Sequence, residues 1–120
     1  MQKYYQYLLK SKAPLENKII NFPKYLKRQS FSKILVRYEL FKKQLKIKGS
    51  IVECGVHEGF GIMSWAHLST IFEPYNYHRK IIGFDTFKGF PEISKKDKKA
   101  KYSKKGSFKQ NYNTYTDLKA

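Results

Sequence analysis

Two short apolar runs, separated by an apolar helical pattern, are the clearest feature of the chain. The first run covers residues 51–54 (IVEC) and leads into a glycine-rich turn. The second covers residues 81–84 (IIGF) and ends at Asp85. Short apolar runs bounded by turn residues favour buried strands. The pattern therefore predicts two strands, the second of which presents a carboxylate at its end.

The stretch between the two runs predicts a helix that joins them. Pro74 lies just beyond the apolar pattern and would stop the helix. A βαβ crossover needs roughly 30 residues, which the distance from Gly55 to Asp85 satisfies. We therefore expect two adjacent parallel strands in a right-handed unit, whose carboxyl ends face one crevice. The apolar positions of the helix are Met63, Trp65, Ala66, Leu68, Ile71 and Phe72.

The glycines of the turn have spacing that departs from known nucleotide fingerprints. Gly55, Gly59 and Gly61 give G-x-x-x-G-x-G, whereas the dinucleotide fingerprint is G-x-G-x-x-G and a P-loop ends in Gly-Lys-Ser/Thr. Glycine permits positive φ and close backbone approach, so the turn suits a ligand but also suits an ordinary loop. Glu53 and Asp85, at the two strand ends, are expected to line one pocket. A nicotinamide-dependent Rossmann enzyme is the alternative interpretation, although the G-x-G-x-x-G fingerprint of such enzymes is missing.

The residues before the first strand predict helices and a linker. Residues 30–46 carry apolar side chains at helical spacing, and Gly49 would follow the helix end. This helix either packs beside the first strand and helps to close the pocket or is purely structural. Residues 4–10 predict a second, short helix. Residues 11–29, interrupted by Pro14 and Pro23, predict a linker with one turn of structure.

The run E-C-G-V at 53–56, followed by Gly59 and by G-F-D-T-F-K-G-F-P at 83–91, resembles the macrocin O-methyltransferase (TylF/MycF-type) family. The two motifs occur together, in order and at a suitable separation, and the resemblance covers residues 30–93. It implies a class I S-adenosylmethionine-dependent enzyme that methylates a hydroxyl, often on a sugar.

The resemblance also implies roles for individual residues. Glu53, Gly55 and Gly59 would form the turn on the methionine side of S-adenosylmethionine, and Asp85 would bind the ribose hydroxyls. His57 either touches the cofactor or is simply exposed in the turn. The remaining implied cofactor-binding positions are Val56 and Thr86. The implied partner is a small hydroxyl acceptor such as a sugar or a nucleotide-linked sugar. A divalent metal such as Mg²⁺ is expected only in the complete enzyme, and no residue here is identifiable as the catalytic base.

The predicted fold class is α/β, an incomplete Rossmann-like methyltransferase fold consisting of a first βαβ unit preceded by helices. Residues 1–29 form a helical and linker segment, residues 30–93 the cofactor-binding portion, and residues 94–120 a lysine-rich loop and tail. No third strand is evident after Pro91. We expect an amino-terminal piece of a methyltransferase, whether truncated, split or from an incomplete reading frame. Two strands give a thin core, so marginal stability is expected.

The chain is strongly basic, with 25 Lys and Arg against 9 Asp and Glu and a net charge of +16. A small nucleic-acid-binding protein, with exposed tyrosines that stack on bases, is therefore the alternative from another class. Only three basic residues are arginines, which favours a solvated basic surface over phosphate and base recognition. The lysine run is predicted to steer an anionic substrate towards the pocket. It comprises Lys95, Lys96, Lys98, Lys99, Lys101, Lys104 and Lys105.

The remaining polar chemistry of the chain is sparse. Cys54, the single cysteine, is predicted to be a small buried residue in a reducing cytoplasm. His57, His67 and His78 lack the spacing of metal ligands, so no zinc site is assigned. Neither a membrane-spanning run nor a signal peptide is evident, and we expect a cytoplasmic protein. The sequence leaves open whether the protein forms a homo-oligomer.

Overall fold

The computed structural model describes residues 2–97 and 104–119, which form two compact units. The first unit is Met1–Gln44 and the second is Leu45–Ala120. The sequence grouped residues 30–44 with the cofactor-binding part, whereas here they belong to the first unit. Each unit is described by itself.

The first unit consists of helices. They are α1 (Gln2–Lys10), α2 (Leu15–Ile20), the 3₁₀ helix η1 (Phe22–Tyr25) and α3 (Arg28–Gln44). The rings of Tyr7 in α1 and Tyr25 in η1 lie 5.5 Å apart, and Tyr25 also hydrogen-bonds Ser11. The helices predicted at 4–10 and 30–46 are present. The linker predicted at 11–29 was wrong, because Pro14 and Pro23 stand at the starts of α2 and η1, where proline is tolerated.

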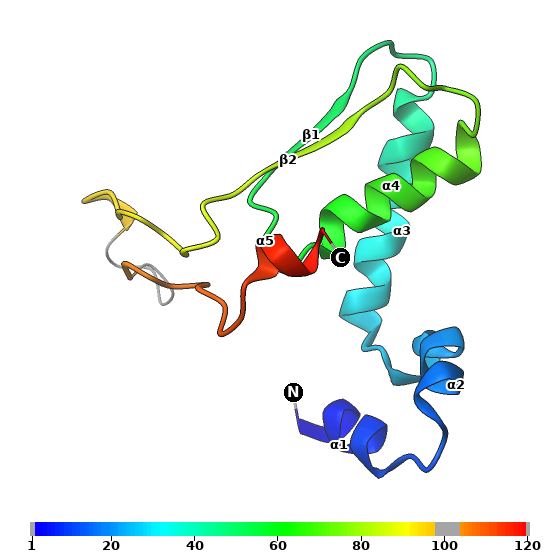
Figure 1. Ribbon diagram of the computed structural model, residues 1–120, viewed down its shortest axis with the longest axis vertical. Coiled ribbons are helices and arrows are strands. Elements are labelled where there is room, and N and C mark those ends of the chain that lie inside the picture. The colour runs from blue at the N-terminus through cyan, green and yellow to red at the C-terminus, as the bar shows by residue number, and fades with distance from the viewer. Residues whose placement is uncertain (1, 98–103, 120) are drawn as a thin grey trace. The chain divides into compact units, whose positions relative to one another are not determined.

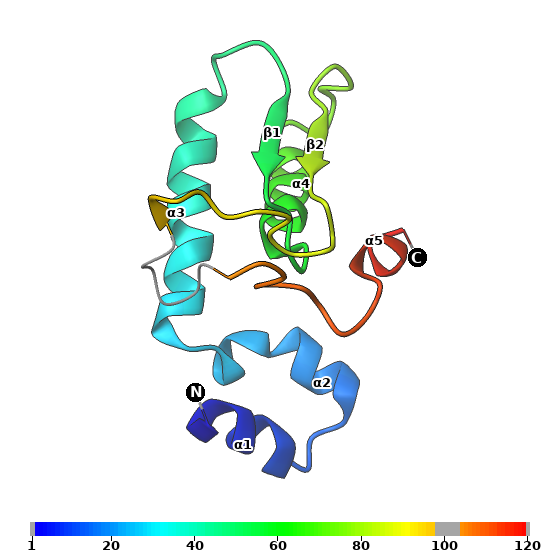
Figure 2. The same cartoon turned by 90° about the vertical axis from the view of Figure 1, so that its left-hand side faces the viewer.

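The second unit contains the predicted βαβ arrangement. Strands β1 (Ile51–Cys54) and β2 (Ile81–Phe84) pair in parallel, with Ile51 opposite Ile81. Helix α4 (Phe60–Phe72) connects them and packs on one face of the pair (Figures 1 and 2). Gly83 in β2 permits this packing, because a Cβ there would lie 2.5 Å from Ile62 Cδ1 of α4. The predicted strands, helix and parallel pairing are all confirmed.

The two faces of β1 differ in burial. Ile51 and Glu53 are half-buried, whereas Val52 and Cys54 on the opposite face are exposed. Side chains alternate between the faces of a strand, and α4 covers only one face of the pair. The predicted burial of Cys54 was therefore wrong.

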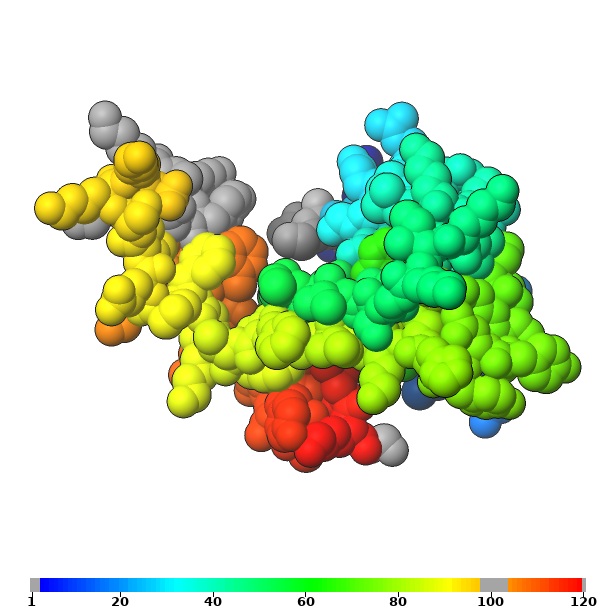
Figure 3. All heavy atoms as spheres, turned by 90° about the horizontal axis from the view of Figure 1, so that it is seen from above, coloured from blue at the N-terminus to red at the C-terminus, as the bar shows by residue number. Residues whose placement is uncertain are grey.

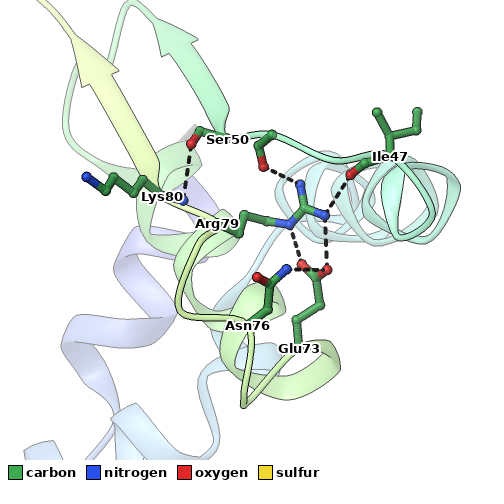
Figure 4. Close-up of polar contacts among 7 residues, drawn as sticks. Ile47, Ser50, Glu73, Asn76, Arg79 and Lys80 are labelled. Carbon is green, nitrogen blue, oxygen red and sulfur yellow. Dashed lines mark hydrogen bonds and ion pairs between the residues drawn. The ribbon is translucent and has the colours of Figure 1, made fainter.

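The starts of the two strands are tied together by Arg79, which precedes β2 (Figure 4). Its guanidinium donates to the carbonyl oxygens of Ile47 and Gly49, at 3.0 and 2.8 Å, just before β1. It also forms a two-point ion pair with Glu73 at the end of α4. One buried side chain thus joins both strands to the helix, at the edge opposite the strand ends.

The chain after β2 returns across the strand ends. Among the described residues, the last helix is the single turn α5 (Thr114–Asp117), and no third strand follows β2. Figure 3 shows the orange and red residues of this return segment against the strands and the yellow loop after β2. Lys95, Lys96, Lys104 and Lys105 are exposed, as a steering role requires. The other predicted lysines, Lys98, Lys99 and Lys101, lie outside the described residues.

Candidate functional site

The turn after β1 uses its three glycines in different ways. Gly55 has φ +87°, and a Cβ added to it would meet nothing within 4 Å, so the space beside it is open. Gly59, the N-cap of α4, also has positive φ, but a Cβ there would lie 2.4 Å from Leu118 Cδ2. Leu118 therefore fills the space beside Gly59. Only Gly55 leaves room for a ligand to approach the backbone.

Gly61 is required for a different reason, which is the close approach of Glu53. It lies inside α4, and a Cβ on it would be 1.9 Å from Glu53 Oε1. The carboxylate of Glu53 therefore packs directly on the first turn of the helix. An acidic group near a helix N-terminus is favoured by the helix dipole.

Replacing Gly61 with alanine is expected to lower the free energy of unfolding by about 1–3 kcal/mol, because the new methyl group displaces the Glu53 carboxylate. Denaturant unfolding measures this change. Met63→Ala, at a half-exposed position of the same helix, is the matched control and should cost less. Equal effects from the two variants would show that the contact between Glu53 and Gly61 is not tight.

Asp85 stands at the end of β2 and binds backbone from both strand ends. Its Oδ2 accepts the backbone N–H of His57 at 2.8 Å, and its Oδ1 accepts that of Phe87 at 2.7 Å. Partial burial raises the pKa of the Asp85 carboxyl, but the N–H groups of His57, Phe87 and Thr86 outweigh it, so the pKa lies below its ordinary value. The carboxylate is ionised at neutral pH and links the two turns.

This lowered pKa makes part of the stability depend on pH. A carboxyl group whose pKa is lowered in the folded state stabilises the fold above its unfolded pKa, and this contribution is lost as pH falls through the folded value. Wild type should therefore exceed Asp85→Asn in unfolding free energy at pH 7, and the difference should shrink below about pH 4. Urea unfolding at several pH values measures it. A difference that stays constant with pH would contradict the linkage.

Among residues 2–97 and 104–119, three residues other than glycine adopt positive φ, and all three lie around these strand ends. They are His57 and Phe87 at +54° and Phe108 at +65°. Such conformations cost free energy and persist only where surrounding contacts impose them. The hydrogen bonds to Asp85 hold His57 and Phe87 in place, and those of the return segment hold Phe108. Strain concentrated in one place makes this edge a candidate functional site.

A pocket of about 470 Å³ opens at this edge, within the size range of small-molecule sites. Its walls are mostly apolar, and Asp85 is the ionised side chain among its lining residues. His57 stands at one side, with its ring at right angles to that of Phe108 and its Nδ1 2.8 Å from Gln110 Nε2. The lining residues are Gly55, His57, Phe84, Asp85, Thr86, Gly89, Phe90, Pro91 and Phe108.

Four of the seven residues predicted to bind a cofactor line this pocket, namely Gly55, His57, Asp85 and Thr86. The others do not: Val56 is buried against Gly83, the carboxylate of Glu53 lies on Gly61, and Leu118 covers Gly59. The two acidic residues therefore do not share the pocket as expected. Cofactor binding by all seven residues stays a prediction.

The sequence did not identify the aromatic wall of the pocket. Phe90 and Pro91 were part of the motif that carries the family resemblance, but no role was assigned to them. Phe108 belongs to a tail whose structure the sequence left undecided. Its ring contacts that of Phe90, which lies far away in the sequence, so no local pattern signals its place in the wall.

Among residues 2–97 and 104–119, no group of three His, Cys, Asp or Glu side chains is arranged to hold a metal ion. The expected Mg²⁺ therefore gains no support from this part of the chain. In the same residues, no helix has the length and apolar character needed to cross a membrane.

No family model matches the sequence, and no curated protein matches it closely. Among solved structures, the calicheamicin methyltransferase CalS11 matches with a TM-score of 0.92 and 33% identity, over 98% of this chain and 46% of that one. The chain has part of a methyltransferase fold. Its α/β unit with a parallel strand pair fits an incomplete Rossmann-like fold, as predicted.

A second structure of CalS11, described as a TDP-rhamnose 3′-O-methyltransferase, matches with a TM-score of 0.66 and 36% identity. That match covers 73% of this chain and 38% of the other. The chain thus spans about half the length, or less, of the solved proteins it matches. Its structural neighbours are sugar O-methyltransferases, which agrees with the methyltransferase prediction. They do not distinguish the TylF/MycF type from related groups.

Proposed function

We propose that this protein is an S-adenosylmethionine-dependent O-methyltransferase of the TylF/MycF type and that its acceptor is the hydroxyl of a nucleotide-linked sugar. The observation that carries the proposal is the position of Asp85 at the end of β2, beside the open space over Gly55. Likeness to a TDP-rhamnose 3′-O-methyltransferase supports the acceptor class.

Asp85 has the chemistry needed for the ribose of the cofactor. Its oxygens accept the N–H of His57 and of Phe87, the N–H of Thr86 also interacts with them, and a carboxylate offers about four lone-pair sites in all. The remaining capacity suits a ribose hydroxyl, which would donate to an ionised acceptor. These N–H groups hold the carboxylate in position before the ligand arrives, which lowers the entropic cost of binding.

Gly55 and Thr86 shape the space around that carboxylate. The N–H of Gly55 donates to Phe84 O at 2.8 Å, so the turn is fixed to the end of β2, and the absence of a side chain admits the ligand. Thr86 Oγ1 donates to Gly89 O and accepts from Lys88 N. Its hydroxyl is thus used within the loop, and Thr86 contributes to the pocket wall.

Bound S-adenosylmethionine would supply an electrophilic methyl group on its sulfonium. Transfer requires the acceptor oxygen to lie in line with that group and to lose its proton. We assign the described residues to cofactor binding and orientation, and none of them to proton removal. The exposed lysines beside the loop would raise the local concentration of an anionic acceptor.

This site gives little support to the two alternative functions, a nucleic-acid-binding protein and a nicotinamide-dependent enzyme. An apolar pocket whose charged group is a carboxylate repels phosphates, which disfavours a nucleic-acid strand there. A dinucleotide-dependent enzyme would also use a carboxylate for a ribose, but its G-x-G-x-x-G fingerprint is missing. A cytoplasmic location and a homo-oligomer stay predictions.

The test is transfer of labelled methyl from S-adenosylmethionine to a nucleoside-diphosphate sugar, combined with calorimetric titration of the full chain with S-adenosylhomocysteine. We expect one saturable site and label in the sugar. Saturable binding without transfer would retain the cofactor site and reject the acceptor class. A folded chain that binds no S-adenosylhomocysteine would overturn the proposed function.

A further inference from the structure

A second cavity lies at the edge where the two strands start, opposite the pocket that contains Asp85. Its volume is about 520 Å³, within the size range of small-molecule sites. It forms where the loop before β1 meets the loop between α4 and β2, and Figure 1 shows both loops at the same end of the strand pair. The two cavities share no lining residue. The lining residues are Leu45, Lys46, Ile47, Lys48, Gly49, Glu73, Asn76, His78 and Arg79.

The hydrogen-bond acceptors of this lining are already used within the chain. The carboxylate of Glu73 is neutralised by Arg79 and also accepts from Asn76 Nδ2 at 3.0 Å (Figure 4). The carbonyl oxygens of Ile47 and Gly49 accept from the same guanidinium. An anion in the cavity would therefore meet no uncompensated negative charge from these lining residues.

The groups that remain in the lining are hydrogen-bond donors and positive charges. Lys46 and Lys48 are exposed, and within residues 2–97 and 104–119 neither forms an ion pair. His78 adds an imidazole, which has an N–H donor in either tautomer. The buried guanidinium of Arg79 has five N–H groups, and the bonds given above use four of them. Within the described residues, one N–H on Nη1 is thus left for a ligand.

We propose that this cavity binds the phosphate group of a small molecule, at a site separate from the cofactor site. Lys46 and Lys48 supply the counter-charge, and the spare N–H of Arg79 donates to a phosphate oxygen. Such charge-assisted hydrogen bonds are roughly twice as strong as neutral ones. The bonds of Arg79 hold both loops in place before the ligand arrives, which lowers the entropic cost of binding. The inference does not rest on the proposed function, because the proposed cofactor site lies at the other end of the strands.

Two exposed tyrosines on the same loop favour a nucleotide over free phosphate as the source of this group. Tyr75 and Tyr77 stand on either side of Asn76, which lines the cavity, and they are 84% and 83% exposed. Exposed rings of this kind stack on the flat face of a base and add affinity without selecting one base. Inorganic phosphate would gain nothing from these rings.

The experiment is a ¹⁵N chemical-shift titration of the full chain with inorganic phosphate and, separately, with uridine diphosphate, at constant ionic strength. Both ligands should shift the amides of Lys46, Lys48 and His78 with saturation. The amide of Thr86, in the other pocket, should change little. Uridine diphosphate should bind at least about 5-fold more tightly than phosphate, since a stacked base adds affinity. Equal dissociation constants would retain the site and identify free phosphate as its ligand.

A pair of lysine variants separates a specific site from the overall charge of the chain. Lys46→Gln combined with Lys48→Gln should weaken both ligands at least about 10-fold. Lys10→Gln combined with Lys12→Gln removes two exposed lysines of the same spacing from the first unit and should change neither dissociation constant. Thermal melting verifies that each double variant is folded.

Three results would overturn the phosphate site. They are equal weakening by the two double variants, shifts that do not saturate, and shifts centred on the pocket that contains Asp85. None of these results bears on the binding of S-adenosylhomocysteine, so failure of the phosphate site is distinguishable from failure of the proposed function.

Discussion

Replacing Arg79 with alanine is expected to lower the free energy of unfolding by about 3–5 kcal/mol. The Arg79 side chain is 4% exposed and that of its partner Glu73 is 10% exposed. Removal of the guanidinium leaves a carboxylate buried without its counter-charge and two carbonyl oxygens, of Ile47 and Gly49, without their donor. The effect should be large because the same side chain holds both strand starts and the end of α4. Urea unfolding measures it.

Three variants separate this network from a general loss of positive charge. Lys80→Ala removes an exposed neighbouring charge and should change stability little. Arg79→Lys keeps the charge but lacks the planar fork, so it should recover only part of the loss. Glu73→Ala combined with Arg79→Ala should cost less than the sum of the single changes, because no buried charge is left unpaired. Additive effects would show that the two side chains act independently.

Replacing Asp85 with asparagine should weaken S-adenosylhomocysteine binding about 10-fold to 100-fold. The asparagine amide keeps the size of the side chain but replaces one acceptor oxygen by a donor. It therefore loses both a charged bond to the backbone of His57 or Phe87 and an acceptor for a ribose hydroxyl. Calorimetric titration gives the two dissociation constants.

The matched control for this change is Asp97→Asn, which alters an exposed carboxylate hydrogen-bonded to Ser94 and outside the pocket. Its dissociation constant should equal that of wild type. If Asp97→Asn weakened binding as much as Asp85→Asn, the effect would be one of overall charge. If a folded Asp85→Asn variant bound as tightly as wild type, Asp85 would not be the ribose ligand.

Much of the second unit could be predicted because its signals are local. The runs at 51–54 and 81–84 and the apolar pattern between them are each complete within a few residues, and the crossover length then leads to parallel pairing. Asp85 followed from the same pattern, because it is the first polar residue after the second run.

The parts that the sequence missed depend on contacts between distant residues. Gly61 was predicted to serve the turn, but its role is to admit Glu53, which lies on the neighbouring strand. Gly59 was expected to face a ligand, but Leu118 from the far end of the chain covers it. The aromatic wall depends on pairing between the loop at Phe90 and the segment at Phe108. Local patterns carry no information about which side chain will fill the space beside a glycine.

In the first unit, the errors came from the treatment of proline. Pro14 and Pro23 were taken to interrupt structure, whereas each lies at the beginning of a helical segment. A proline lacks an N–H, but the first N–H groups of a helix have no partner within it, so this position tolerates the loss. Whether a proline interrupts a helix or begins one depends on its position relative to the next apolar run.

The measurement that tests the central claim most directly is a ¹⁵N chemical-shift titration of the full chain with S-adenosylhomocysteine. The proposed cofactor site predicts that the largest shifts fall on the amides of Gly55, His57, Thr86 and Gly89, with little change at Ile47 and Arg79 at the opposite edge of the strands. A folded chain whose amides do not move with saturating ligand, or whose shifts cluster at that opposite edge, would contradict the account.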